Sequence, residues 1–222
     1  MDRPTLAGGA TRGARATGSP HGHGIHGEHV AFQRSCSEYA EAAQWSEPAR
    51  GARLYRDAER AFECAESLAP DDGRIVFAHG HAAYMNRDVS VERALHLFDE
   101  ALARAPDHAW ARLYRAHCLH DLERWTEAAD AYAAVPKGAF EGPRSWRMHL
   151  LVEQQALCLL RGGRREEALA LFSKILGRYE AQPHLARWGD LRYADQAVDD
   201  LPELKEPLAR AREALARTEL GR

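Results

Sequence analysis

The chain has 222 residues, of which 45% are hydrophobic and 28% are charged, so it is long enough for one or two soluble domains with a real core. Its 30 Lys and Arg residues against 33 Asp and Glu residues give a formal net charge of -3. This balance excludes the global basic field that drives non-specific binding to nucleic acid, so we expect no nucleic-acid partner. No stretch approaches the roughly 18 consecutive apolar residues of a membrane span, and the N-terminus lacks the apolar core of a secretory signal. The expected location is the cytoplasm, without membrane insertion.

The cysteines give no sign of a structural cross-link. They are widely spaced and form no C-x-x-C pair: Cys36, Cys64, Cys118 and Cys158. Neither a disulfide framework nor a thiolate zinc site is therefore indicated. All but three of the 30 basic residues are arginine, in a chain rich in alanine, which is typical of a GC-rich genome and suggests a bacterial source.

The first 28 residues differ in composition from the rest of the chain. They are rich in glycine and almost without large apolar side chains, so they cannot offset the entropy lost when a backbone is ordered. We expect a disordered tail over 1–28. From about Val30 onward, Ala, Leu, Arg and Glu dominate, and apolar residues stand three and four positions apart. This periodicity predicts an all-α fold.

One pattern recurs along the helical part of the chain. In each copy an alanine is followed four residues later by an aromatic residue and three residues after that by a small or aliphatic one. The opening alanines stand 36, 34 and 40 residues apart. Spacings of three, four and seven place these side chains on one face of a helix, where the small alanines allow a neighbouring helix to approach closely. The copies are Ala58, Phe62, Ala65; Ala94, Phe98, Ala101; Ala128, Tyr132, Val135; and Ala168, Phe172, Ile175.

This pattern resembles that of the tetratricopeptide repeat (TPR) family. A partner helix precedes each of the last three copies, at about 74–86, 110–122 and 149–161. The resemblance implies a TPR-type α-solenoid, a right-handed superhelix of helix pairs. We expect three clear repeats at about 73–178, a weaker one at 29–69, an array that ends at 183, and C-terminal capping helices over 184–222. The linker 136–145 is longer than an ordinary inter-repeat turn, so it either packs back on the array or forms part of the binding surface.

In this family the first helix of each repeat lines a concave groove that holds a peptide or a helix of a partner. By position, the resemblance implies a groove lined by Phe77, His81, Tyr84, Trp110, Leu113, His117, His120, Asp121, Leu150, Glu153, Leu157 and Arg161, with Tyr114 at its edge. Trp110 is expected to be the most exposed of them. Alternatively, Phe77, Leu113, Leu157 and Tyr114 only pack between helices.

The resemblance implies a protein-binding adaptor or scaffold. Relatives that hold the acidic C-terminus of heat-shock chaperones grip a carboxylate with Lys and Asn, whereas the matching positions here include Phe77, His81 and Glu153. This departure disfavours that ligand and favours an apolar or helical partner. Pairing of the array with its own copy, to give a homo-oligomer, is a further expectation that the sequence leaves open.

The N-terminal histidines support a different hypothesis, a metal-handling or metal-sensing protein. His21, His23, His26 and His29 lie within nine residues, and neutral imidazole is a common ligand of Zn, Ni or Cu. A glycine-rich segment without preformed geometry also binds metal adventitiously. A second possible cluster combines His79, His81, His117 and His120 with Asp121, although hydrogen-bonded groove histidines explain these residues equally well.

Sequence motifs of enzymes are missing. The chain contains no G-x-x-x-x-G-K-[ST], G-x-G-x-x-G, H-E-x-x-H or G-x-S-x-G. We therefore expect a protein that is not an enzyme, has no catalytic residues, and needs no cofactor apart from any metal held by the histidine-rich tail.

Overall fold

The computed structural model describes residues 47–136, 138–140, 146–186 and 191–220. Over these residues the fold is all-α, and no strand is present among them. The long helices are α2 (Pro48–Leu68), α3 (Gly73–Met85), α4 (Val91–Arg104), α5 (Ala109–Asp121), α6 (Trp125–Ala133), α7 (Trp146–Arg161), α8 (Arg165–Ala181) and α11 (Lys205–Leu220). Between α8 and α11 lie the short helices α9 (Pro183–Ala186) and α10 (Arg192–Ala197) and the 3-10 turn η2 (Pro202–Leu204).

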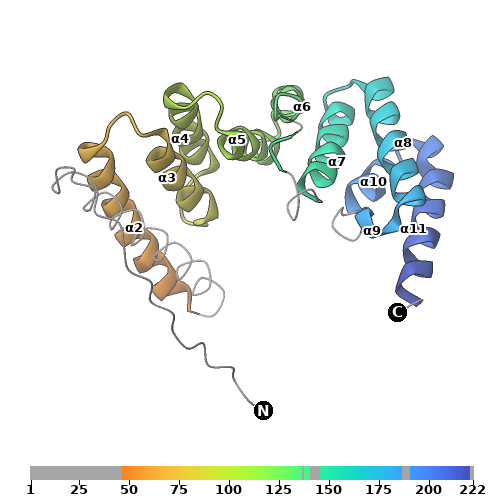
Figure 1. Ribbon diagram of the computed structural model, residues 1–222, viewed down its shortest axis with the longest axis horizontal. Coiled ribbons are helices and arrows are strands. Elements are labelled where there is room, and N and C mark those ends of the chain that lie inside the picture. Colours follow the sequence, from red (N-terminus) through yellow and green to blue (C-terminus); the bar gives the residue numbers. More distant parts are fainter. Residues whose placement is uncertain (1–46, 137, 141–145, 187–190, 221–222) are drawn as a thin grey trace, which may run out of the picture.

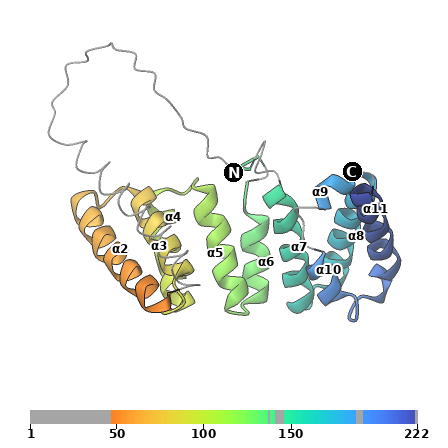
Figure 2. The same ribbon diagram turned by 90° about the horizontal axis from the view of Figure 1, so that it is seen from below.

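The helices form an arch built from antiparallel pairs. The pairs α3/α4, α5/α6 and α7/α8 follow one another along the chain, and each helix packs on the next (Figure 1). At one end α2 packs on α3, and at the other end α11 packs on α8. Seen from below, the helices stand side by side in chain order (Figure 2). This is the TPR-type α-solenoid that the repeated pattern predicts.

The repeated pattern forms the core of the arch. Its alanines Ala58, Ala94, Ala128 and Ala168 are completely buried, and its aromatic residues Phe62, Phe98, Tyr132 and Phe172 are at most 1% exposed. Close packing explains why a glycine stands in α3, because a Cβ at Gly80 would lie 3.0 Å from the ring of Phe98. A patch of small residues with one large ring in each pair therefore fixes the spacing between neighbouring helices.

Two inter-helix turns have the same geometry with different residues. Gly163, between α7 and α8, has a φ of 83°, and Glu123, between α5 and α6, has a φ of 56°. In both turns the next amide bonds back across the helix end, from Arg164 to Leu159 O at 2.8 Å and from Arg124 to Leu119 O at 2.9 Å. Glycine adopts this left-handed backbone without steric cost, whereas glutamate does not.

The C-terminal helices cover the last repeat. Leu201, Leu204, Leu208 and Ala211 are buried, and α11 lies along α8. Ion pairs join this unit to the turn between α7 and α8, since Arg165 reaches Glu203 at 3.1 Å. The apolar edge of α8, which a further repeat would otherwise cover, is therefore closed by the C-terminal helices.

Candidate protein-interaction face

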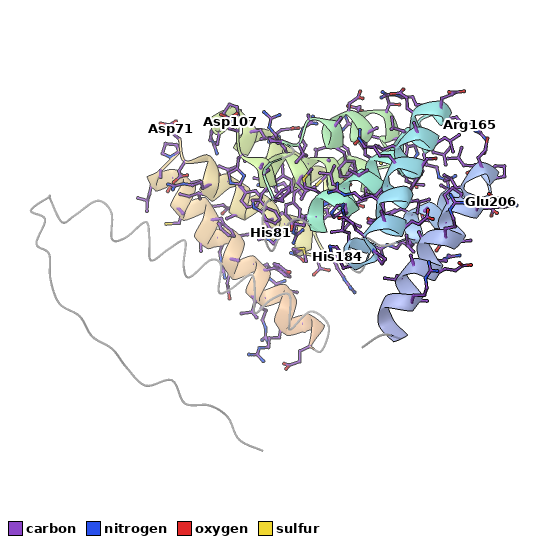
Figure 3. All side chains as sticks on the ribbon, turned by 45° about the vertical axis from the view of Figure 1, so that its right-hand side comes forward. Asp71, His81, Asp107, Arg165, His184 and Glu206 are labelled. Carbon is purple, nitrogen blue, oxygen red and sulfur yellow. The ribbon has the colours of Figure 1, made fainter. Side chains whose placement is uncertain are left out.

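The inner face of the arch is formed by α3, α5 and α7, and its centre is Tyr114 on α5. Six aromatic or imidazole rings surround the Tyr114 ring, with centroids 4.7 to 6.3 Å away: Phe77, His81, Tyr84, Phe98, Trp110 and His117. We call Tyr114 and these six residues the Tyr114 cluster. Phe98 is its buried floor, while the other six side chains are half-buried. Figure 3 shows His81 on the inner side of the arch, with Asp71 and Asp107 on the opposite side.

Hydrogen bonds fix the polar atoms of this face. His81 Nε2 lies 3.0 Å from the Tyr114 hydroxyl, and the Tyr84 hydroxyl donates to Asp121 Oδ2 at 2.7 Å. Each bond joins α3 to α5. Burial and the hydrogen bond to Asp121 raise the pKa of Tyr84 above its ordinary value. Tyr84 is therefore a neutral donor at pH 7, and its acceptor Asp121 is exposed at the C-terminal edge of α5.

The histidines of α5 bond to Tyr132 of the neighbouring helix. The Tyr132 hydroxyl lies 2.8 Å from His117 Nδ1 and 3.4 Å from His120 Nδ1. Burial, followed by the charges of His120 and Arg147, lowers the pKa of His117 to about 3. Burial also lowers the pKa of His81 and of His120. These imidazoles are neutral at pH 7, so they offer hydrogen bonds and flat apolar area rather than positive charge.

Trp110 is less open than its position in the repeat predicts. Its ring is half-buried, with the edge-on ring of Phe140 at 4.7 Å and the Arg147 guanidinium carbon 4.6 Å from its centroid. Phe140, in the linker after α6, is itself 2% exposed. Trp110, which was expected to be exposed, is thus half-buried against Phe140 and Arg147.

The α7 part of the expected groove is occupied by the chain itself. Glu153 is 1% exposed and accepts a hydrogen bond of 2.5 Å from Tyr179, so it does not line an open face. Leu157 is 3% exposed, and Arg161 pairs with Asp200 at 3.2 Å. Beside these residues, Gln154 donates to the hydroxyl of Tyr193 on α10 at 3.0 Å. Glu153 is therefore not part of an open groove, and Leu157 packs between helices as the alternative interpretation holds, while Arg161 stays exposed beside Asp200.

The remaining expected residues separate into two groups. Leu113 is 2% exposed and packs between helices, as the alternative interpretation holds. Phe77, His81, Tyr84, Tyr114, His117 and His120 come together on α3 and α5, with Asp121 at their edge. The rings of the inner face thus come from two repeats, and α7 adds the half-buried Arg147 and Leu150.

Sequence reasoning did not place Tyr132 beside this face, and it identified Arg147 only as part of a basic stretch around the last repeat that could receive an acidic partner segment. Arg147 precedes Leu150 by three residues and Gln154 by seven, so helical spacing places it on the inner face of α7. That signal was available in the sequence. Tyr132 belongs to the core pattern, and nothing in the pattern indicates that its hydroxyl reaches two histidines.

The comparisons with known proteins bear on this architecture. A family model described as tetratricopeptide repeat matches residues 90–150, which run from the N-cap of α4 into α7. This part of the chain is therefore similar to the tetratricopeptide repeat family. A comparison with curated proteins finds no match.

Two solved structures share this TPR fold. The one described as "MamA MSR-1 C2" is 17% identical, with a TM-score of 0.56, over 86% of this chain and 98% of its own. The one described as "MamA RS-1 ArsTM double mutant" is 16% identical, with a TM-score of 0.54, over 85% of this chain and 96% of its own. At these identities the likeness concerns the fold.

The histidines of the TPR array do not form the second metal cluster considered above. His79 is 2% exposed, stacks on Phe62, and bonds through Nδ1 to Glu66 at 2.7 Å, away from His81. Within the described part of the chain, no group of three His, Cys, Asp or Glu residues could hold a metal ion. The histidine-rich segment His21, His23, His26 and His29 lies outside the described residues, so metal binding there stays a prediction.

None of the helices in the described ranges is long and apolar enough to cross a bilayer.

The TPR array also has a cavity on its outer surface. On the side of α5 opposite the Tyr114 cluster, a shallow cavity of about 260 Å³ is lined by Leu102, Pro106, Arg112, Arg115, Ala131 and Ala134. This cavity provides a second surface, against which binding to the inner face can be tested.

Proposed function

We propose that this protein is a non-catalytic adaptor or scaffold that binds a peptide or helix of a partner protein on the inner face of α3 and α5. The Tyr114 cluster carries this proposal, because six of its seven rings are half-buried on the concave side of a TPR array. The partner's apolar side chains pack against Phe77, Tyr84 and Tyr114, and the neutral imidazoles of His81 and His117 set the register by hydrogen bonding.

The physical chemistry of this face favours protein binding. Tyrosine and tryptophan offer large contact areas and lose little side-chain entropy on binding, which is why they dominate interface hot spots. The hydrogen bonds of Tyr84 to Asp121 and of Tyr114 to His81 hold the rings in place before a partner arrives. A pre-ordered surface lowers the entropic cost of association.

Affinity capture from a lysate of the source organism tests this function. The bait is the full chain in three forms: the wild type, Tyr84→Ala/Trp110→Ala on the inner face, and Ala131→Glu at the outer cavity as the matched control. Circular dichroism and thermal unfolding first establish that all three are folded. We expect the wild type and the control to retain the same protein, and the double variant to lose it.

Recovery of the same protein with all three baits would contradict binding at the inner face. Loss with Ala131→Glu alone would transfer the binding site to the outer cavity. Light scattering of the purified chain distinguishes a second copy of this protein from a different partner, because an isologous contact raises the measured mass without any added protein.

A further inference from the structure

The inner face already holds one helix, which belongs to the chain itself. The short helix α10 packs on α7, where Tyr193 accepts a hydrogen bond from Gln154 and lies edge-on to His120 of α5, with ring centroids 6.2 Å apart. In Figure 1, α9 and α10 lie beneath α7 on the concave side. The open surface over α3 and α5 adjoins the part of α7 on which α10 packs. A helix from a partner that binds this surface would therefore lie beside α10.

The open surface has opposite charges at its two ends. Arg147, at the start of α7, extends over Trp110 at the start of α5, and its charge contributes to the lowered pKa of both His81 and His117. Asp121, at the other end of α5, is exposed and bonds to Tyr84. Trp110 and Asp121 are 11 residues apart, and at about 1.5 Å per residue their positions along α5 differ by about 16 Å.

Among the described residues, two further arginines lie at the boundary between α7 and the C-terminal unit. Arg161 is paired with Asp200, and the guanidinium of Arg192 lies over the ring of Tyr193, 5.1 Å from its centroid. Between the two ends stand the Tyr114 cluster and His120, in which the tyrosines and histidines are neutral at pH 7. A ligand therefore meets a neutral aromatic centre, with a positive charge at the N-terminal end of α5 and a negative charge at the C-terminal end.

We propose that the inner face of α3 and α5 binds an amphipathic helix of a partner protein that carries an acidic residue near Arg147 and a basic residue near Asp121, about three helical turns apart. This inference rests on the proposed function and adds the chemistry of the partner. The apolar stripe of that helix faces Phe77, Tyr84 and Tyr114. Charge complementarity of this kind selects among partners more than it adds affinity.

Three synthetic peptides test the proposal against three forms of the full chain. Each peptide is a helix of about 18 residues with the same leucine and tyrosine stripe and two charged positions about 11 residues apart, to match the span of α5. The charged pair is acidic and basic, both acidic, or both basic. The proteins are the wild type, Asp121→Lys and Arg147→Glu, and binding is measured by fluorescence anisotropy of the labelled peptides.

The preferred peptide should change with the protein. We expect the wild type to bind the mixed peptide about three- to fivefold more tightly than the others, as is usual for rim charges. Asp121→Lys should prefer the doubly acidic peptide, and Arg147→Glu the doubly basic one. Asp107→Lys makes the same charge change as Asp121→Lys but lies on the opposite side of the arch (Figure 3), so it should keep the preference of the wild type.

An unchanged preference in Asp121→Lys and Arg147→Glu, or equal affinity of the wild type for all three peptides, would overturn the inference. Equal binding of all peptides leaves the adaptor function standing, since the face then binds helices without reading their charge. Absence of binding by every peptide also overturns the inference, while the capture experiment with Tyr84→Ala/Trp110→Ala decides the proposed function independently.

Discussion

The Tyr114 hydroxyl and His81 Nε2 lie 3.0 Å apart and join the first helices of two consecutive repeats. Tyr114 also contacts rings from α3, α4 and α5, so one side chain links the open face to the buried core. The surface proposed to bind a partner is therefore also part of what holds α3 and α5 together.

This dual role predicts a graded response at Tyr114. Tyr114→Phe keeps the ring and removes the hydrogen bond, so the free energy of unfolding should fall by about 1 kcal/mol. Tyr114→Ala also removes the ring contacts and should cost about 3 kcal/mol. Urea unfolding followed by circular dichroism measures both changes. Equal losses in the two variants would mean that the ring contacts contribute nothing.

The two left-handed turns predict opposite effects of glycine and alanine. Gly163→Ala should lower the free energy of unfolding by about 1 kcal/mol, because alanine at a φ of 83° is strained. Glu123→Gly should raise it by roughly 0.5 kcal/mol, since relief of the same strain is partly offset by the greater freedom of glycine in the unfolded chain. Thermal unfolding provides the comparison, with Glu123→Ala as the control that keeps the strain. A gain in Glu123→Ala equal to that in Glu123→Gly would show that the glutamate side chain, not the backbone, is unfavourable.

Histidines that are neutral in the folded chain make stability depend on pH between 7.5 and 5.5. The pKa of His117 is lowered to about 3, while the unfolded chain takes up the proton near pH 6.5. Stability is therefore complete above pH 6.5 and falls as the pH decreases toward 3, by about 1.4 kcal/mol at pH 5.5 from His117 alone. Burial lowers the pKa of His81, His120 and His149 as well, which adds to the slope.

Denaturant titrations at pH 7.5 and 5.5 measure this slope. The variant His117→Gln keeps a polar group beside Tyr132 and does not titrate, so its stability should fall less between the two pH values. A variant with the slope of the wild type would mean that His117 is protonated in the folded chain.

The histidine-rich segment is best tested by calorimetric titration of Zn or Ni into the full chain and into a chain that lacks residues 21–29. The metal-handling hypothesis requires tight, stoichiometric binding that disappears with the deletion, at a pH above 6.5, where imidazole is neutral. Millimolar affinity in the full chain would reject the metal-handling hypothesis.

Local periodicity explains which parts of the fold could be predicted. The spacing of Ala94, Phe98 and Ala101 predicts a helix, the face of it that is buried, and the close approach of a neighbouring helix. All three depend only on residues in consecutive turns. Contacts between segments that are far apart in the sequence produce no such periodic pattern. Glu153 accepts a hydrogen bond from Tyr179, which lies 26 residues later in the sequence. Trp110 contacts the ring of Phe140, a residue of the linker outside the repeat.

The same distinction applies to the candidate site. Phe77, His81, Tyr84 and Tyr114 lie close together because equivalent positions of parallel helices face the same side, which the repeat alone implies. The α7 positions follow the same rule, yet Glu153 and Leu157 are buried, and Glu153 bonds to Tyr179 of α8. The repeat alone therefore places the rings of the inner face on one side but does not indicate which α7 positions are buried.

The position of α11 restricts where further repeats can be added to the array. Its Leu208 and Ala211 are buried while Glu206 and Arg210 point to solvent, so the flank of α8 is already covered by a helix with a polar exterior. An additional helix pair cannot stack there unless α11 is displaced. Duplication or engineered insertion of repeats in this protein must therefore occur upstream of α7, and doing so would lengthen the recognition surface while leaving its closed end unchanged.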